Sequence, residues 1–356
     1  MEQAILWILS AGALLGGLDL LFGNRFRLGE HFKEGFALLG PTALSMVGIL
    51  CFAPLLSRAL EGTAAPLFLR IGLDPALLGG ILAIDMGGYQ TAKSLAQDAA
   101  IGEFAGILVA STLGCTVTFT IPMGTGIIPK EALNDFFRGV LIGLITLPFA
   151  LLLGGAVCGL PVLYLFMQSL PIFLLALLFG AGLRLFPRQT LRFFSGFAAL
   201  LRWLSILGLT LGAAQYICGK TLIPGLAPAE DAMKIVAGIC LFMAGSLPAA
   251  ELLRRALSHP LRRLGQTLDL RDDSLTALLV GFVSVTPALA ALKKMDARGR
   301  TVTAAFLVCA ASTLASHLGF TLSVSPEMML PLLLTKSAGG ALGAVAALTL
   351  TRKAAS

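Results

Sequence analysis

Residues 77–98, LLGGILAIDMGGYQTAKSLAQD, form an apolar segment that one carboxylate and a pair of glycines interrupt near its middle. Gly87 and Gly88 weaken a helix from the inside. An ionised Asp85 near the centre of a bilayer costs about 2.5–3.5 kcal/mol even on the most lenient insertion scale. Non-helical backbone persists at membrane depth only where protein or a water-filled cavity surrounds it. The segment therefore predicts a kinked span or a re-entrant hairpin that lines a cavity.

The composition of the whole chain is that of a membrane protein. Of its 356 residues, 57% are hydrophobic and 13% are charged, and the mean hydropathy is +0.90. Soluble domains carry about 25% charged residues. The sequence thus predicts an all-α polytopic membrane protein that lies in the lipid bilayer. The net charge of +7 is then expected to record orientation, because Lys and Arg stay on the cytoplasmic side, and no nucleic-acid partner is expected.

Eleven apolar stretches can be drawn along the chain, and most are about 20 residues long, enough for one crossing each. They are 4–22, 36–56, 67–95, 103–124, 138–159, 161–184, 197–217, 233–252, 274–293, 301–320 and 327–350. Two of them are interrupted: 67–95 by Asp85 and the glycine pair, and 274–293 by Ser284, Thr286 and Pro287. A proline inside a helix removes a backbone donor and clashes with the preceding turn, so both stretches are expected to be broken.

The distribution of Lys and Arg distinguishes two topologies. If all eleven stretches cross the membrane, the inside holds 12 of these residues and the outside 13, so there is no bias. If the two broken stretches enter and leave on one side, the inside holds 20 and the outside 5. The positive-inside rule favours this second topology, with about nine crossings and two hairpins. The N-terminus is then outside and the C-terminus inside; eleven crossings remain the alternative.

The nine-crossing topology contains an internal repeat. The order helix, helix, broken stretch, helix, helix occurs in residues 1–160 and again in 193–356, with 161–192 as a linking helix and cytoplasmic loop. The breaks lie near 85–88 and 284–287. Five crossings separate the starts of the two halves, so their orientations are opposite. Inverted repeats with discontinuous helices are typical of transporters and place the binding site near the membrane midplane.

Motifs of enzymes, cofactors and metal sites are missing from the sequence. HExxH, GxSxG, a Walker A loop and a GxGxxG turn after a strand do not occur, so hydrolase, protease and nucleotide-binding chemistry is not indicated. The six cysteines lie in apolar runs without CxxC spacing, which favours packing residues over disulfides or metal ligands. We therefore expect a carrier that is not an enzyme and has no cofactor or metal.

Asp85 is the sharpest candidate for substrate binding. No Lys or Arg lies within two turns on its N-terminal side, so a cationic substrate, a coupling ion or a proton is a natural partner. The alternative is a structural carboxylate that caps the second half-helix. Carbonyls freed beside Gly87 and Gly88 would suit an ammonium, which has three donors. Tyr89 and Gln90 offer a hydroxyl and an amide nearby, unless they are ordinary interfacial and helical residues.

The second half of the chain contributes further candidates. Ser284 and Thr286 are either ligands or partners for backbone groups that Pro287 frees. His317 is the one histidine inside an apolar stretch, so it is a candidate for a proton relay or a substrate contact, with a structural hydrogen bond as the alternative. Three charged residues are candidate charge partners or coupling groups: Asp19, Lys93 and Lys336. Pairing of Lys336 with Asp85 or Asp19 is one expectation, and snorkelling to an interface is another.

Several segments, in order along nearly the whole chain, resemble the EutH family of ethanolamine-utilisation transporters. They are EGFALLGPTALSMVGILCFAPLL (34–56), ILAIDMGGYQTAKSLA (81–96), LIPGLAP (222–228), KKMDARGR (293–300), HLGF (317–320) and TKSAGG (335–340). The resemblance implies a bacterial inner-membrane protein that admits ethanolamine to cells that catabolise it. Many members of the family have paired asparagines before the proline and an aspartate before the histidine; this chain has Ser284, Val285, Thr286 and Ser316 there.

Ethanolamine is an ammonium joined by two carbons to a hydroxyl, so a carboxylate suits one end and a hydroxyl or amide side chain the other. We therefore expect an ethanolamine importer that works by alternating access, either facilitated or coupled to H⁺ or Na⁺. Because the second half is less polar than the family pattern, a carrier of another small amine or amino alcohol is an alternative. A membrane scaffold or sensor for ethanolamine-catabolic enzymes is the alternative of another class. The sequence leaves a homo-oligomer open.

Overall fold

The computed structural model describes residues 2–82, 85–268 and 270–351, and the regular elements in these ranges are all helical. Among the described residues, nine helical segments are long and apolar enough to cross a membrane. They are Gln3–Leu21, Leu28–Glu61, Ala99–Ile127, Lys130–Val157, Val162–Leu185, Pro187–Cys218, Ala229–Leu257, Ala297–Val324 and Pro326–Leu350. The two stretches predicted to be broken are not in this set. The all-α polytopic fold with nine long helices is therefore confirmed, and the described residues do not form the eleven continuous spans of the alternative.

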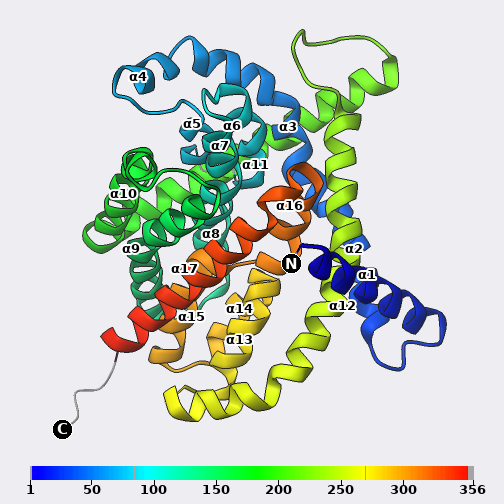
Figure 1. The fold of residues 1–356 in the computed structure, drawn as a ribbon, viewed down its shortest axis with the longest axis vertical. Helices are drawn as coiled ribbons and strands as arrows, with labels where there is room; N and C mark the ends of the chain where they lie inside the picture. Colours follow the sequence, from blue (N-terminus) through cyan, green and yellow to red (C-terminus); the bar gives the residue numbers. More distant parts are fainter. Residues whose placement is uncertain (1, 83–84, 269, 352–356) are drawn as a thin grey trace.

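Figure 1 shows how these helices surround the two broken stretches. The long helices are α1 (Glu2–Leu21), α3 (Leu39–Glu61), α9 (Leu133–Val157), α10 (Val162–Leu185), α11 (Pro187–Cys218), α12 (Ala229–Leu268), α15 (Ala297–Ala310) and α17 (Met329–Leu350). The shorter ones are α2 (Leu28–Ala37), α4 (Ala65–Arg70), α5 (Leu77–Ile81), α6 (Tyr89–Leu95), α7 (Ala99–Glu103), α8 (Ile121–Ile127), α13 (Asp272–Val283), α14 (Val285–Ala291) and α16 (Leu318–Val324). The loop expected within 161–192 shortens to Phe186, because Pro187 begins α11 at a position where a missing N–H has no cost.

The first broken stretch is a hairpin whose two ends meet at Asp74. Beyond α5 the chain forms a 3₁₀ turn over Asp85–Gly88 and then returns as α6. The carboxylate of Asp74 accepts hydrogen bonds from the backbone N–H groups of Ala76 at 2.8 Å, Gln97 at 3.1 Å and Asp98 at 2.8 Å. The segment thus starts and finishes at one place, as a re-entrant hairpin does.

The second broken stretch closes in a similar way. Ser284 separates α13 from α14 with an extended backbone, φ −146° and ψ 127°. Its two ends meet where Gly299, at the start of α15, packs so closely on Ser274 that an added Cβ would clash with the Ser274 hydroxyl. Pro287 lies in the first turn of α14, where its missing N–H has no intrahelical acceptor to lose. The break therefore precedes the proline instead of occurring at it.

A further break, which the sequence did not predict, divides the span Ala297–Val324. α15 ends at Ala310, and Ser312 takes the left-handed conformation at φ 54°. A π-helical turn over Thr313–His317 then leads into α16. The first half has the same succession, with a π-helical turn over Thr116–Thr120 directly before α8.

Two helix crossings are made through glycines and join the two halves of the chain. α1 packs on α12 where Gly12 faces the carbonyl oxygen of Gly245, and α11 packs on α3 where Gly208 faces the carbonyl oxygen of Gly48. An added Cβ at Gly12 or Gly208 would clash with the facing backbone. Small residues at crossings let helix backbones approach closely within a membrane.

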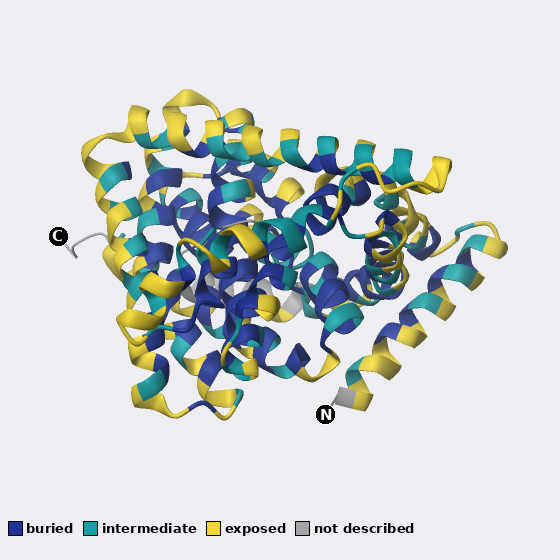
Figure 2. Ribbon diagram, turned by 90° about the horizontal axis from the view of Figure 1, so that it is seen from above, coloured by how far each residue is buried: buried dark blue, intermediate teal, exposed yellow. Residues whose placement is uncertain are grey.

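The outer surface of the bundle is apolar, as a lipid-facing surface should be. Figure 2 shows exposed residues on the outward faces of the peripheral helices and buried residues in the interior. Large apolar side chains exposed on these faces include Trp7, Leu14, Leu163, Leu177, Trp203 and Ile206. Contiguous exposed apolar surface on this scale is typical of contact with a membrane.

Candidate functional site

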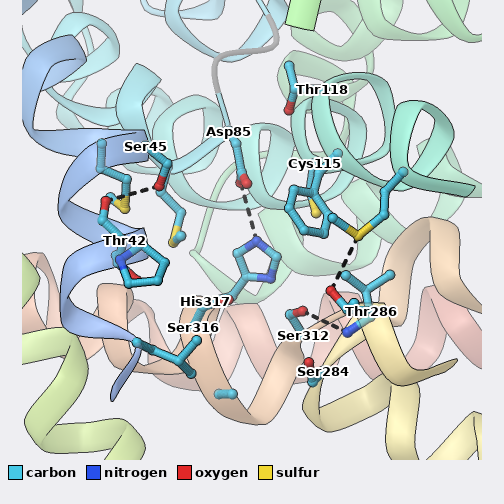
Figure 3. Close-up of a pocket in the computed structure, with 18 of the residues that line it drawn as sticks. Thr42, Ser45, Asp85, Cys115, Thr118, Ser284, Thr286, Ser312, Ser316 and His317 are labelled. Carbon is cyan, nitrogen blue, oxygen red and sulfur yellow. Dashed lines mark hydrogen bonds and ion pairs between the residues drawn. The ribbon is translucent and has the colours of Figure 1, made fainter. Parts of the chain in front are cut away.

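A cavity of about 530 Å³ lies between α2, α3, α11, α12 and the two hairpins. Figure 3 shows side chains that line it and the contacts between them. The polar and ionisable residues in the lining are Glu34, Thr42, Ser45, Asp85, Cys115, Thr118, Arg202, Ser284, Thr286, Ser312, Ser316 and His317. Both broken stretches and the unpredicted break at Ser312 therefore contribute to one cavity.

Asp85 begins the 3₁₀ turn at the tip of the first hairpin. Its φ of 52° is left-handed, a conformation that Asp tolerates better than most residues. Its side chain is 24% exposed, and Oδ1 lies 3.2 Å from Nε2 of His317 (Figure 3). The carboxylate thus faces the cavity and has an imidazole as its neighbour.

His317 is fixed by the break that precedes it. Its side chain is 1% exposed, and Nδ1 lies 3.0 Å from the carbonyl oxygen of Ala311. In an unbroken helix that carbonyl would accept from the N–H four residues on. Because the chain departs from helical geometry at Ala311 and Ser312, the carbonyl is free to hold the imidazole. The break therefore orients His317 toward Asp85.

Hydroxyl groups gather where the second hairpin meets this break. The Ser312 hydroxyl accepts from the N–H of Val285 at 3.2 Å, and the N–H of Ser312 donates to the Gly281 carbonyl at 2.9 Å. Thr286 is exposed to the cavity and donates to Sδ of Met123 at 3.3 Å. A thioether is a weak acceptor, so the Thr286 hydroxyl remains available to a better partner.

The structure separates the candidates of the first hairpin into two groups. Gly87 lines the cavity with Asp85, whereas Gly88, Tyr89 and Gln90 are not among the described residues of its lining. Tyr89 is 1% exposed and donates to Glu103 at 3.1 Å. It also accepts from Lys93 at 3.1 Å. Tyr89 therefore belongs to a cluster with Lys93 and Glu103 that is separate from the described lining of the cavity.

The candidate charge partners take other roles. Lys93 forms an ion pair with Glu103 at 3.3 Å. Lys336 is fully buried, and its ammonium donates to the Ser111 carbonyl at 2.7 Å instead of to a carboxylate. Asp19 accepts from the N–H groups of Phe26, Leu28 and Gly29, so it caps the start of α2. The expected pairing of Lys336 with Asp85 or Asp19 is therefore replaced by a backbone contact.

Cys115 and Ser312 are the main residues of the site that sequence reasoning missed. Cys115 lies between two π-helical segments, and its Sγ lies within 4.8 Å of ligand atoms of Asp85 and His317. These three residue types also occur in metal sites, and two of them, Asp85 and His317, lie within hydrogen-bond distance of each other. No Gly or Pro adjoins Ser312, and the single Gly114 before Cys115 is too common in membrane helices to mark a site.

A second pocket of about 320 Å³ lies further along the same two helices. α3 lines the large cavity up to Ile49 and the second pocket from Leu50 onward. α12 lines the second pocket with residues 231–235 and the large cavity with Met243 and Leu247. Gln90 of α6 belongs to the second pocket, beside Ser57 and Ser94. The two spaces are therefore successive compartments along α3 and α12.

Comparisons with known proteins give one consistent result. Residues 1–350 match the family described as "Ethanolamine utilisation protein, EutH". The chain is 36% identical to the "Probable ethanolamine permease EutH" of Listeria monocytogenes, over 96% of this chain and 91% of that protein. It is 36% identical to the "Uncharacterized protein YxeR" of Bacillus subtilis, over 99% and 95%.

A more distant relative carries the same description. The chain is 32% identical to the "Probable ethanolamine permease EutH" of Escherichia coli, over 96% of this chain and 93% of that protein. No solved structure matches the chain significantly. The relatives from Listeria monocytogenes and Escherichia coli are named as permeases and not as enzymes, in agreement with the prediction from motifs.

Proposed function

The chain belongs to the EutH family, and with that membership as the premise we propose that it carries ethanolamine across the bacterial inner membrane. The choice of ethanolamine as the substrate rests on the names of its relatives. The observation that carries the proposal is a carboxylate, Asp85, at the tip of a broken hairpin and at the wall of a cavity whose largely apolar lining contains several polar side chains. Ethanolamine is an ammonium at neutral pH, so it is a cation that such a carboxylate attracts.

Asp85 binds the ammonium in this proposal. A carboxylate that faces a cavity inside a membrane protein needs a cation nearby, and the described ammonium of Lys336 is held by the Ser111 carbonyl. Charge-assisted hydrogen bonds contribute about 1.5–3 kcal/mol each. Nε2 of His317, 3.2 Å from the carboxylate, is placed to accept a second N–H of the same ammonium.

The hydroxyl of the substrate binds on the second hairpin. Thr286 and Ser284 line the cavity there, and the partner of Thr286 among the described residues is a thioether. A site that satisfies both ends of the molecule rejects analogues that lack the hydroxyl. The cavity of about 530 Å³ is larger than a molecule with four non-hydrogen atoms needs, so the hairpins must approach each other to enclose it.

The two compartments along α3 and α12 support transport by alternating access. The large cavity adjoins the halves of α11 and α12 nearest Arg192 and Arg254, on the side that the positive-inside rule assigns to the cytoplasm. We assign this arrangement to a state open to the inside, with the second pocket as the collapsed outer route. The N-terminus is then outside and the C-terminus inside.

The recurrence of elements supports two inverted repeats that move against each other. π-Helical turns precede α8 and α16 in the two halves, and the glycine crossings pair the first helix of each half with a helix of the other. Repeats related by an axis in the membrane plane exchange an outward and an inward opening when they rock. The repeats of this proposal are residues 1–160 and 193–356, joined by 161–192.

Uptake of radiolabelled ethanolamine by the purified protein in liposomes tests the proposal. Asp85→Asn keeps the size of the side chain and removes its charge, so uptake at low external ethanolamine should fall by about ten- to a hundredfold, the equivalent of one charged hydrogen bond. Glu61→Gln, which neutralises an exposed carboxylate at the end of α3, is the matched control and should retain full uptake. Full uptake by the Asp85→Asn variant would refute the assignment of the site.

The same preparation distinguishes the alternatives. Competition by ethylamine, propanolamine and choline shows whether another small amine is preferred over ethanolamine. Uptake by the purified protein with no enzyme present excludes a scaffold or sensor as the sole function. Absence of uptake of every amine, with intact binding of cytoplasmic ethanolamine enzymes, would favour the scaffold.

A further inference from the structure

The contact between His317 and Asp85 requires a proton that neither side chain supplies there in its ordinary ionisation state. The carbonyl oxygen of Ala311 can only accept, so Nδ1 of His317, 3.0 Å away, must carry a hydrogen. A neutral imidazole has one N–H, which leaves Nε2 as an acceptor. An ionised carboxylate has acceptors only. Nε2 and Oδ1 nevertheless lie at 3.2 Å, a distance at which two bare acceptors repel.

One proton between the two atoms resolves this conflict. It resides either on His317 as an imidazolium beside a carboxylate, or on Asp85 as a carboxylic acid beside a neutral imidazole. Both forms have zero net charge, which suits an imidazole that is 1% exposed inside a membrane protein. The proton belongs to the pair and not to either residue.

We propose that this proton and the ammonium of the substrate occupy the same place in turn, so that the protein exchanges one H⁺ for one alkylammonium ion. The inference rests on the proposed function and names its coupling ion. When the ammonium arrives, its N–H groups donate to Oδ1 of Asp85 and Nε2 of His317, and the shared proton leaves to the water of the cavity. One positive charge enters and one leaves, so the net charge of the site is the same when it is occupied and when it is empty.

The other charged and titratable groups around the pair have separate roles or positions. They are Cys115 beside the pair, Lys336 with an electrostatic interaction with both members, Glu34 and Arg202 in the cavity lining, and the cluster of Tyr89, Lys93 and Glu103. Lys336 donates to Ser111, and Tyr89, Lys93 and Glu103 contact one another. Among these groups, Nε2 of His317 and Oδ1 of Asp85 are the two acceptor atoms that lie at hydrogen-bond distance from each other.

The exchange predicts a proton stoichiometry and a pH dependence. Below the pH at which the empty pair titrates, binding of one ethanolamine should release about one proton, and the apparent Kd should rise about tenfold for each unit by which the pH falls. Net transport is electroneutral, because a cation moves in one direction and a proton in the other. A membrane potential alone should therefore leave the rate of uptake unchanged.

Proton release on binding is measured with the purified wild-type protein in weakly buffered detergent solution that contains a pH indicator and EDTA. Ethanolamine hydrochloride is titrated between pH 5.5 and 7.5, and binding is followed in parallel with radiolabelled ethanolamine. His317→Gln puts a non-titrating amide in place of the imidazole. Because it also removes the Nε2 acceptor, it should bind ethanolamine more weakly, with almost no proton release and with an affinity nearly independent of pH. His31→Gln, the same change at a histidine that contacts Glu34, is the control and should release protons as the wild type does.

The outcomes separate this inference from the proposed function. Binding with about one proton released in the wild type, and with none in His317→Gln, supports the exchange. Binding without proton release in the wild type overturns the exchange and leaves the ethanolamine carrier standing, whereas absence of binding and uptake overturns both. Loss of binding caused by EDTA would put a metal ion in place of the proton and would also overturn the exchange.

Transport gives an independent readout. In proteoliposomes, uptake in excess of that into protein-free liposomes should rise when the interior is more acidic than the exterior. It should not respond to a potential set with potassium and valinomycin. A current that accompanies uptake would overturn the electroneutral exchange.

Discussion

The carboxylate of Asp74 accepts hydrogen bonds from both ends of the hairpin that carries Asp85, and removal of this carboxylate should open the hairpin. In the Asp74→Ala variant, the N–H groups of Ala76, Gln97 and Asp98 lose their acceptor. The residue is 4% exposed, so water replaces the carboxylate poorly. A buried donor left without a partner costs about 1–3 kcal/mol, or about 3–9 kcal/mol for three. Because the contacts of Gln97 and Asp98 are only partly buried, we expect the lower part of that range, about 3–6 kcal/mol.

Asp98→Ala is the matched control, because it removes a carboxylate from the same end of the hairpin but only one hydrogen bond, to the N–H of Ala100. Loss of such an N-cap costs about 0.5–2 kcal/mol. Asp74→Asn keeps one acceptor oxygen and should lie between the two. All three variants are compared with the wild type by apparent melting temperature in detergent at a fixed heating rate, because membrane proteins commonly unfold irreversibly.

The expected order of melting temperatures is wild type, Asp98→Ala, Asp74→Asn and Asp74→Ala, from highest to lowest. Ethanolamine uptake should follow the same order, because displacement of the hairpin moves Asp85 away from His317. Equal melting temperatures for Asp74→Ala and Asp98→Ala would refute this role of Asp74, since its two additional hydrogen bonds would then contribute nothing to stability.

Three further predictions concern packing, topology and specificity. Gly208→Ala forces a methyl group against the backbone of Gly48 and should lower the free energy of unfolding by about 1–3 kcal/mol. Gly196→Ala on the same helix has open space around it and should be neutral or stabilising. Equal melting temperatures for the two variants would contradict the close crossing at Gly208. Cys218 is the exposed cysteine, so a membrane-impermeant maleimide should label it from outside the cell and not from inside, and labelling from inside only would reverse the proposed orientation. Thr286→Val should weaken ethanolamine binding by about tenfold, one neutral hydrogen bond, and leave ethylamine binding unchanged; a matching loss for ethylamine would exclude a contact with the hydroxyl.

The membrane fold and the first break could be predicted because their causes are local. A carboxylate followed by two glycines cannot continue an apolar helix comfortably, and the structure has a 3₁₀ turn from Asp85 to Gly88 at that place. The second break was predicted for an incomplete reason. Its turn lies at Ser284, and Pro287 is accommodated in the first turn of the helix that follows.

The rest of the site depends on contacts between distant parts of the chain. Asp85 and His317 are 232 residues apart, and no spacing rule connects them. The break at Ser312 has no Gly or Pro; hydrogen bonds to Gly281 and from Val285 hold it. Tyr89 seemed a neighbour of Asp85 from its place in the sequence, but it lies in the next helical turn and points to Glu103.

The glycine crossings have a consequence for how the protein is made. α1 leaves the ribosome before α12 is made, yet the backbone on which it packs belongs to α12, more than 200 residues further along the chain. Until α12 is made, lipid or another helix must contact the surface of α1 at Gly12, because the backbone at Gly245 that finally packs there has not yet been synthesised. α3 waits in the same way for α11. Assembly of the bundle is therefore expected to finish late, after insertion of the individual helices, and a truncated first half should be a substrate for membrane quality-control proteases.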